Sequence, residues 1–308
     1  MSEFKLLQVP DGLAGSRVDA GVAKMLGLSR TAIAELVESG KLTSNGKVLS
    51  KSDRLTADQL IEVDLEAPKN NLIINADEVE GFKIVFQDDH IVVIDKPAGV
   101  ASHPSVGWVG PTVPGALLSL GIQLSTSGAS ERQGIVQRLD VGTSGLMTLA
   151  KSEVAYSRLK QAFRDRTVHK TYHALVQGHP DPMAGTFDAP IARHPKSEFK
   201  FHVAEGGKDS VTHYETLEML RAASLVEVIL ETGRTHQIRV HFSAFRHPLV
   251  GDTMYGADPT LAAKLHLDRQ WLHAVKLSFE HPITGEQVYF ESSYPDDLKQ
   301  ALESLRNA

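Results

Sequence analysis

The chain has 308 residues, of which 42% are hydrophobic, and its formal net charge is −6. This length can bury one large core or two smaller ones. The absence of cysteine excludes disulfides, thiol nucleophiles and cysteine-ligated zinc, which leaves carboxylates, histidines, hydroxyls and basic side chains for chemistry. No apolar run is long enough for a membrane span and no basic-then-apolar leader is visible, so we expect a cytoplasmic protein without membrane contact.

The acidic balance argues against nonspecific nucleic-acid binding but allows a local basic face. Basic side chains crowd residues 158–170 and 193–202, whereas acidic side chains collect in residues 58–80. From composition alone, ordinary solvated charge explains these stretches as well as a binding face does.

The first part of the chain predicts a compact helix-hairpin unit. Apolar residues at helical spacing indicate a helix from Val18 onward, and a second helix is expected to be capped by Ser29 and to end at Gly40. The pair Asn45-Gly46 predicts a two-residue hairpin turn, and residues 61–65 alternate as a strand.

The polar segment 66–78 contains proline and asparagine and predicts a linker, so we place one domain at 15–75 and a second at 82–308. In the second domain we expect strands at 91–94, 170–176, 211–217 and 225–230. Helices are expected to be capped by Ser152 and Thr235. Strands that follow one another with occasional helices indicate an α+β fold.

Residues 137–145 read Gln-Arg-Leu-Asp-Val-Gly-Thr-Ser-Gly and lie between two apolar stretches. A glycine-bearing loop of this kind exposes its carboxylate. An isolated loop aspartate such as Asp140 would usually cap a turn, so its interpretation depends on the rest of the chain.

This loop resembles the signature loop of the RluA-type pseudouridine synthases, which reads Arg-Leu-Asp followed by Thr-Ser-Gly. Further blocks follow in the family's order across roughly residues 83–295, namely Asp95-Lys96-Pro97-Ala98-Gly99, His103-Pro104, Lys170-Thr171-Tyr172, Gly233-Arg234-Thr235-His236-Gln237-Ile238-Arg239, His247-Pro248-Leu249, Gly251-Asp252, Tyr255-Gly256 and Leu272-His273-Ala274. The resemblance implies a mixed, largely antiparallel sheet and a cofactor-free enzyme that isomerises uridine in RNA.

Residues 15–75 resemble the alpha-L RNA-binding motif, named from small-subunit ribosomal protein four. The similarity lies in Arg17-Val18-Asp19, Ser29-Arg30, Glu38-Ser39-Gly40, Asn45-Gly46 and Ile61-Glu62-Val63. The chain departs from the motif at Ala57-Asp58, where Gly-Asp is usual, so the last turn is expected to differ. Together, the two resemblances imply an enzyme most similar to those acting on large-subunit ribosomal RNA.

The resemblance assigns Asp140 the role of catalytic carboxylate. Such a group can attack the sugar, attack the uracil ring or remove a sugar proton, and the sequence does not choose among these routes. A neighbouring guanidinium favours an ionised carboxylate in a partly dry pocket, and Arg239 is expected to supply it, with Arg234 as the second candidate.

Three more side chains are expected to contact the substrate. Tyr172 would stack on the extruded uracil, and its hydroxyl could assist proton removal from carbon five. Leu272 would form the opposite apolar wall. Arg138 would fill the space left by the flipped nucleotide or contact phosphate, unless it forms a salt bridge that holds the loop.

RNA, from the ribosome or a ribosomal precursor particle, is the expected partner, and we expect a monomer. Phosphate contacts are predicted for five basic residues: Arg30, Lys41, Lys47, Arg164 and Arg166. Metal catalysis is not expected, because His236 and His241 are five residues apart and no acidic residue stands at metal-site spacing.

Gln137 stands where the family loop commonly has histidine. This departure bears on how the loop is held in place more than on whether the enzyme is active. This departure and the acidic balance leave a noncatalytic, ribosome-associated RNA-binding protein as the alternative. A hydrolase acting on nucleosides would also use Asp140 but would release free uracil.

Overall fold

The computed structural model describes residues 3–26, 30–65, 74–105, 108–197 and 199–307. Contacts within the chain divide it into two compact units, residues 1–71 and 72–308, which are described separately. The expected cap Ser29 and most of the expected linker lie outside the described residues. In the described part of the chain, no helix has the length and apolar character needed to cross a membrane.

The small unit is a four-stranded sheet with two helices, in the strand order β1-β4-β2-β3. Its elements are β1 (Glu3–Gln8), α1 (Val18–Leu26), α2 (Arg30–Glu38), β2 (Leu42–Ser44), β3 (Lys47–Val48) and β4 (Leu60–Leu65), with a short 3-10 helix at Asp11–Leu13. The predicted helices, hairpin and strand are confirmed, and Asn45 and Gly46 both have the positive φ values (50° and 74°) of a tight hairpin turn. Strand β1 was not predicted; it pairs antiparallel with β4.

The departure from the alpha-L pattern falls on a turn with an unusual backbone. Asp58 has a positive φ of 58°, a conformation that glycine adopts more readily. Its carboxylate accepts a hydrogen bond of 2.8 Å from the Gln8 amide of β1. The turn therefore joins the last strand to a segment that precedes the predicted motif.

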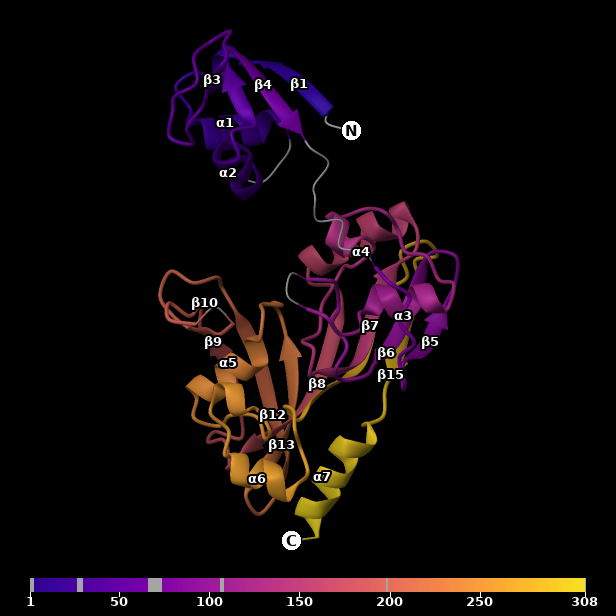
Figure 1. Ribbon diagram of the computed structural model, residues 1–308. Helices are drawn as coiled ribbons and strands as arrows, with labels where there is room; N and C mark the ends of the chain where they lie inside the picture. Colours follow the sequence, from indigo (N-terminus) through magenta and orange to yellow (C-terminus); the bar gives the residue numbers. More distant parts are fainter. Residues whose placement is uncertain (1–2, 27–29, 66–73, 106–107, 198, 308) are drawn as a thin grey trace. The chain divides into compact units, whose positions relative to one another are not determined.

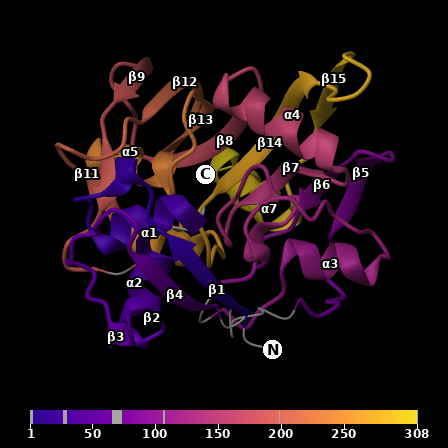
Figure 2. The ribbon, with the colours of Figure 1, turned by 90° about the horizontal axis from the view of Figure 1, so that it is seen from above.

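The large unit is built on a nine-stranded sheet (Figure 1). Its strands are β5 (Lys83–Gln87), β6 (Ile91–Lys96), β7 (Ser144–Ala150), β8 (His169–Gln177), β9 (Ala184–Asp188), β12 (Val211–Met219), β13 (Ala223–Leu230), β14 (Leu272–Glu280) and β15 (Gln287–Glu291). The order is β5-β6-β7-β14-β8-β13-β12-β9, with β15 beside β14, and Figure 2 shows this succession from β9 to β5. The β7–β14 pair is parallel and the other described pairs are antiparallel, which confirms the mixed, largely antiparallel sheet.

Helices cover both faces of this sheet. They are α3 (Val113–Ser119), α4 (Glu153–Arg164), α5 (Gln237–Ala244), α6 (Pro259–Lys264) and α7 (Asp296–Arg306), with 3-10 turns at Ser130–Arg132 and Thr253–Tyr255. A separate hairpin consists of β10 (Ile191–Arg193) and β11 (Phe201–Val203). As predicted, Ser152 caps α4 by accepting a hydrogen bond from the Ala155 amide at 3.2 Å.

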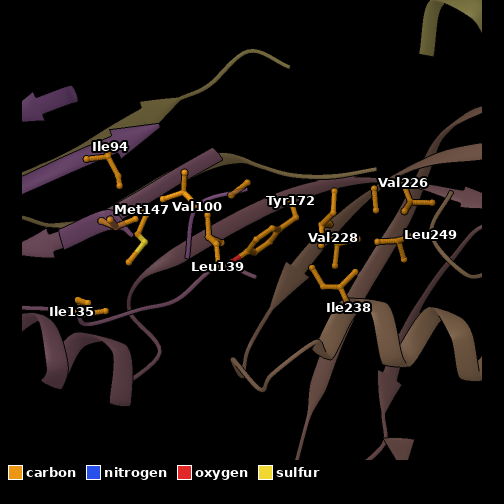
Figure 3. Packing of buried hydrophobic residues seen from close by; sticks show 14 of the residues in the cluster. Ile94, Val100, Ile135, Leu139, Met147, Tyr172, Val226, Val228, Ile238 and Leu249 are labelled. Carbon is orange, nitrogen blue, oxygen red and sulfur yellow. The ribbon is translucent and has the colours of Figure 1, made fainter. Parts of the chain in front are cut away.

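Alternation along the strands assigns each side chain to one of two layers. Ile91 and Val93 of β6 pack against α4, whereas Val92 and Ile94 belong to the cluster that includes α3 and α5. In β8, Tyr172, Ala174 and Val176 all belong to the α3 and α5 layer, and Leu175 packs on the opposite side with α7. Figure 3 shows Tyr172 among Leu139, Val228 and Ile238 of the same cluster.

The prediction that Thr235 caps α5 is wrong. The helix begins at Gln237, after His236, whose φ of 58° interrupts the helical path. The side-chain carbonyl of Gln237 accepts a hydrogen bond from the Arg234 amide at 2.9 Å, so this side chain reaches back over the start of its own helix. The Thr235 hydroxyl instead accepts a hydrogen bond of 3.2 Å from Arg138.

Candidate active site

The predicted chemical residues gather around one cavity of about 1280 Å³ in the large unit. The loop of residues 137–143, Tyr172 of β8 and Arg239 of α5 line it, and so do Arg138, Arg234 and Leu272. These residues come from positions as far apart as 137 and 272 in the chain. The sheet order brings β8 and β14 side by side, and the loop enters β7 next to them.

Asp140 occupies a loop whose backbone is held from both sides. The Ser102 hydroxyl donates to the carbonyl of Leu139 at 2.7 Å and accepts from its amide at 2.9 Å, and Leu139 itself is buried. The carbonyl of Asp140 accepts a turn hydrogen bond of 3.0 Å from the Thr143 amide. The Asp140 side chain is about a quarter exposed and therefore reaches the cavity.

Arg239 connects Asp140 to a second, fully buried carboxylate. Its Nη1 donates to Oδ2 of Asp140 at 3.2 Å, while Nε and Nη2 form a two-pronged pair with Asp252 at 2.7 and 2.9 Å. Burial opposes the charge of Arg239, but the two carboxylates outweigh it, so the pKa of Arg239 is raised. A two-pronged pair fixes the plane of the guanidinium, and Nη1 is thereby directed at Asp140.

The two oxygens of Asp140 have different surroundings. Oδ2 accepts from Arg239 and lies 4.0 Å from Nε2 of His236. Among the described residues, no hydrogen bond is made to Oδ1. Oδ2 of Asp140 is thus tethered, whereas Oδ1 has no such bond, and the residue lines the cavity.

His236 is itself oriented by a tyrosine. The Tyr255 hydroxyl accepts a hydrogen bond from the Phe201 amide at 3.0 Å and lies 2.8 Å from Nδ1 of His236. This contact with the Tyr255 hydroxyl fixes the orientation of the imidazole ring, and Nε2 lies on the side of Asp140. Burial lowers the pKa of His236, which favours the neutral ring.

Tyr172 and Leu272 form adjoining parts of one apolar surface. Tyr172 pairs with Ala274 of β14 and Leu272 pairs with Ala174 of β8, and all four side chains belong to the same buried cluster. Leu272 therefore lies beside Tyr172, not across the cavity from it as expected, because both side chains project from the same face of neighbouring strands. Burial, together with the charge of Asp140, raises the pKa of Tyr172.

Arg138 and Arg234 also line the cavity, and both donate hydrogen bonds to neutral oxygen atoms. Arg138 is exposed. Its Nη2 donates to the Thr235 hydroxyl at 3.2 Å, and its Nη1 lies 3.3 Å from Nε2 of His103. Arg234 donates to the carbonyl of Asp209 at 2.9 Å. Nε2 of Gln137 is buried and has no hydrogen-bond partner among the described residues, so this amide nitrogen gives the loop no support.

Basic residues line the edge of the same cavity. Arg164 donates to the Gln161 side chain at 3.0 Å, and Arg166 forms an ion pair of 2.6 Å with Glu231. Both arginines are exposed. The charge of Arg166 is therefore partly neutralised, whereas Arg164 keeps its full charge beside a neutral amide.

The small unit places its predicted phosphate-binding residues differently. Arg30 forms an ion pair of 2.7 Å with the buried Asp19, which also pairs with Arg17 at 3.1 Å. Lys47 is exposed on β3, and Lys41 is half-buried before β2. Arg30 thus helps to hold α2 to α1 as well as presenting charge.

Lys96 supports the loop from inside the large unit, a role that the sequence did not predict. Its side chain is completely buried, and Nζ donates to the carbonyls of Pro97, Val100 and Val141 at 3.0, 2.8 and 3.4 Å. Burial lowers the pKa of Lys96 to about 7, while the charge of Asp140 acts in the opposite direction. Asp252, His236 and Tyr255 also lie in motifs that resemble the family, and this resemblance is the sequence signal for them.

Residues 90–244 match the family model described as RNA pseudouridylate synthase. An uncharacterized RNA pseudouridine synthase of Mycobacterium bovis is 58% identical over 97% of this chain and 97% of that protein. The chain belongs to the RNA pseudouridine synthase family. Members of this family isomerise uridine to pseudouridine in RNA, and this protein is such an enzyme.

Other pseudouridine synthases match along nearly the whole chain. The ribosomal large subunit pseudouridine synthase D of Nitrosomonas europaea is 40% identical, covering 98% of this chain and 88% of that protein. The protein of the same name from Pseudomonas aeruginosa is 40% identical, with coverage of 97% and 95%. Among solved structures, human RNA pseudouridylate synthase domain containing 4 superimposes with a TM-score of 0.58 at 26% identity, covering 73% of this chain and 93% of that one.

Proposed function

We propose that this pseudouridine synthase acts on large-subunit ribosomal RNA, with Asp140 as its catalytic carboxylate. The substrate is inferred from relatives that carry this activity in their names and match along nearly the whole chain. The residue is inferred from one arrangement: Oδ2 of Asp140 is tethered to Arg239 at 3.2 Å, and Oδ1 is left for the substrate.

The reaction moves one bond and one proton. The bond from ribose carbon one to uracil nitrogen one breaks, the base rotates, and its carbon five joins the same sugar carbon. Carbon five then loses its proton and nitrogen one gains one, so no redox partner is needed. Oδ1 of Asp140 could attack the sugar or the ring, or remove a sugar proton, and all three routes stay open.

We propose that Tyr172 and Leu272 receive the extruded base. A uridine must leave its stack to reach the cavity, and an aromatic ring offers a surface on which the base can stack. The raised pKa of Tyr172 disfavours a phenolate, so stacking is the main role we assign to it. Arg138, which is exposed at the edge of the cavity, would contact phosphate or fill the space that the base leaves.

We further propose that residues 15–75 form an RNA-binding domain in which Arg30, Lys41 and Lys47 contact phosphates. The exposed Lys47 carries most of this expectation, because the charge of Arg30 is shared with Asp19. We expect the enzyme to act as a monomer, with Arg164 and Arg166 adding phosphate contacts near the catalytic loop.

The test combines a pseudouridine map with two aspartate variants. Ribosomal and transfer RNA from cells with and without the enzyme are mapped for pseudouridine, and the sites that depend on the enzyme are expected in large-subunit RNA. Asp140→Asn preserves shape and removes charge, so it should bind RNA and lack isomerisation. Asp89→Asn, which changes another loop aspartate that is exposed, should keep full activity.

Three outcomes would contradict the proposal. Substantial turnover by Asp140→Asn would remove Asp140 from the chemistry. Sites confined to transfer RNA would overturn the substrate. Release of free uracil by the wild type would indicate hydrolysis of the glycosidic bond instead of isomerisation.

A further inference from the structure

The C-terminal helix α7 is linked to the catalytic loop by a single arginine. Arg269 precedes β14, and its side chain is 9% exposed. Its Nε and Nη2 pair with the two oxygens of Asp297 in α7 at 2.6 and 2.9 Å. The remaining nitrogen, Nη1, donates to the carbonyl of Gly142 at 3.0 Å and contacts the Ser144 hydroxyl at 3.4 Å.

The contacted carbonyl is two residues from Asp140. A rotation of the peptide at Gly142 would turn the loop and change the direction of the Asp140 side chain. The space for such a movement is small: a side chain at Gly142 would meet Gln270 at 2.6 Å, and the Gln270 amide contacts the Thr143 hydroxyl at 3.2 Å. Arg269 and Gln270 thus hold consecutive residues of the loop.

A chain of hydrogen bonds continues from Arg269 through the sheet. The Ser144 hydroxyl lies 2.9 Å from Nδ1 of His273, and Nε2 of His273 lies 3.0 Å from the Ser292 hydroxyl. Ser292 donates to Asp95 at 2.6 Å, so it accepts from Nε2 of His273, and Nδ1 is left to accept from Ser144. Every donor in this chain then points away from Arg269, toward Asp95.

We propose that Arg269 is a positioning residue for uridine isomerisation, which holds the loop of Asp140 in its reactive geometry and is itself oriented by Asp297. This inference rests on the proposed catalytic role of Asp140. Both Arg269 and Asp297 lie outside residues 90–244, which the family model matches. Helix α7 would thereby influence the position of the Asp140 carboxylate on the other face of the sheet.

Helix α7 does not depend on Asp297 for its attachment. Leu298, Ala301, Leu302 and Leu305 are buried in the cluster around Trp271, and the Trp271 ring donates to the carbonyl of Leu298 at 2.8 Å. Loss of the Asp297 charge should therefore leave the helix docked. The orientation of Arg269 is what changes, because an amide offers one acceptor oxygen where the carboxylate offers two.

The experiment compares neighbouring residues in the first turn of α7. Asp297→Asn is expected to lower kcat on a saturating short RNA about 10- to 100-fold, since small misplacements of a catalytic group have effects of that size. Its KM, RNA affinity and thermal midpoint should stay near the wild-type values. Asp296→Asn removes the same charge at an exposed position of the same turn and should keep the wild-type kcat. Asp297→Glu keeps a carboxylate and should recover most of the rate.

The outcomes separate this proposal from the assignment of Asp140. If Asp140→Asn is inactive and Asp297→Asn keeps the wild-type kcat, the positioning role of Arg269 is wrong and the catalytic role of Asp140 stands. Equal losses in Asp296→Asn and Asp297→Asn, or a loss that follows the thermal midpoint, would also overturn the positioning role. If Asp140→Asn is itself active, the catalytic assignment fails first.

Discussion

At the scale of single residues, the active site depends on pairs of side chains that fix one another's direction. Arg239 is aimed at Asp140 because Asp252 holds its other two nitrogens, and His236 is aimed by Tyr255. Each pair leaves one group facing the cavity. The chemistry that a residue can perform therefore depends on its partner as much as on its type.

The hydroxyl of Tyr172 can be separated from its ring by two substitutions. Tyr172→Phe keeps the stacking surface and removes the hydroxyl, whereas Tyr172→Leu removes the ring as well. If the hydroxyl assists proton removal from carbon five, Tyr172→Phe should accumulate rearranged product and release it slowly in single-turnover assays. We expect Tyr172→Leu to lose turnover whether or not the hydroxyl assists proton removal. A wild-type rate for Tyr172→Phe would restrict this residue to stacking.

His273 should make the stability of the enzyme depend on pH. Burial, and the nearby charges of Arg269 and His173, lower the pKa of His273 to about 4 from its ordinary 6.5. Between these values the unfolded chain binds a proton that the folded chain excludes, so stability is complete above pH 6.5 and is lost as the pH falls toward 4. The shift corresponds to about 3 kcal/mol.

The measurement is urea unfolding of the wild type and of His273→Gln between pH 7 and pH 4. The wild type should lose about 3 kcal/mol more than the variant over this range, because the variant has no group to protonate at that position. Parallel pH profiles would show that the hydrogen bonds from Ser144 and to Ser292 do not keep His273 neutral.

At the scale of elements, the junction of β7 with β14 determines where the catalytic loop ends. Gly145 has a φ of 114°, and a Cβ there would lie 2.4 Å from the carbonyl oxygen of Ala274. Glycine is thus required twice, once by the backbone and once by the approach of the neighbouring strand. This is a physical reason for glycine at the end of the Thr-Ser-Gly sequence.

Gly145→Ala is expected to destabilise the large unit by roughly 4 kcal/mol, which combines a left-handed backbone with a steric overlap. Gly206→Ala provides the control, because Gly206 also has a positive φ, of 74°, but has nothing within 4 Å of its Cβ position. That change should cost about 1 kcal/mol. Similar midpoints for the two variants in denaturant unfolding would mean that the strands separate without cost at this junction.

At the scale of the whole molecule, an acidic chain must still bind an acidic polymer. The net charge is −6, yet the cavity is bordered by exposed Arg164 and Arg166. Each phosphate contact releases counterions, so the logarithm of the binding constant falls with the logarithm of salt concentration by about 0.7 per contact on single strands. The slope of the binding constant against salt concentration therefore measures how many phosphate contacts a local basic face makes.

Changing Arg164 and Arg166 together to Gln should weaken RNA binding across sequences and flatten this slope. Complete loss of two contacts would reduce the slope by about 1.4. We expect a smaller reduction, since Arg166 is already paired with Glu231. Chemistry on saturating RNA should change little. Arg221 and Lys264, which are exposed and do not line the cavity, provide the matched double change to Gln. Equal slopes for the two double variants would place the phosphate contacts elsewhere.

Features that depend on near neighbours were predictable from the sequence. The strands expected at 170–176 and 225–230 correspond to β8 and β13, the Ser152 cap and the Asn45-Gly46 turn were correct, and the blocks of the resemblance indicated the family. Thr235 was misread because its hydroxyl bonds to Arg138, 97 positions away, and not to its own helix.

The partners of the reactive groups were decided by tertiary structure. Asp140 and Arg239 are 99 positions apart, and Arg269 and Gly142 are 127 apart. No local pattern encodes such distances, because they follow from the order of strands in the sheet, which places β14 between β7 and β8. The sequence by itself thus indicated the family and several of the elements, β8, β13 and α4 among them. Only the packing of the sheet and its helices decided which oxygen of Asp140 is held and which is free.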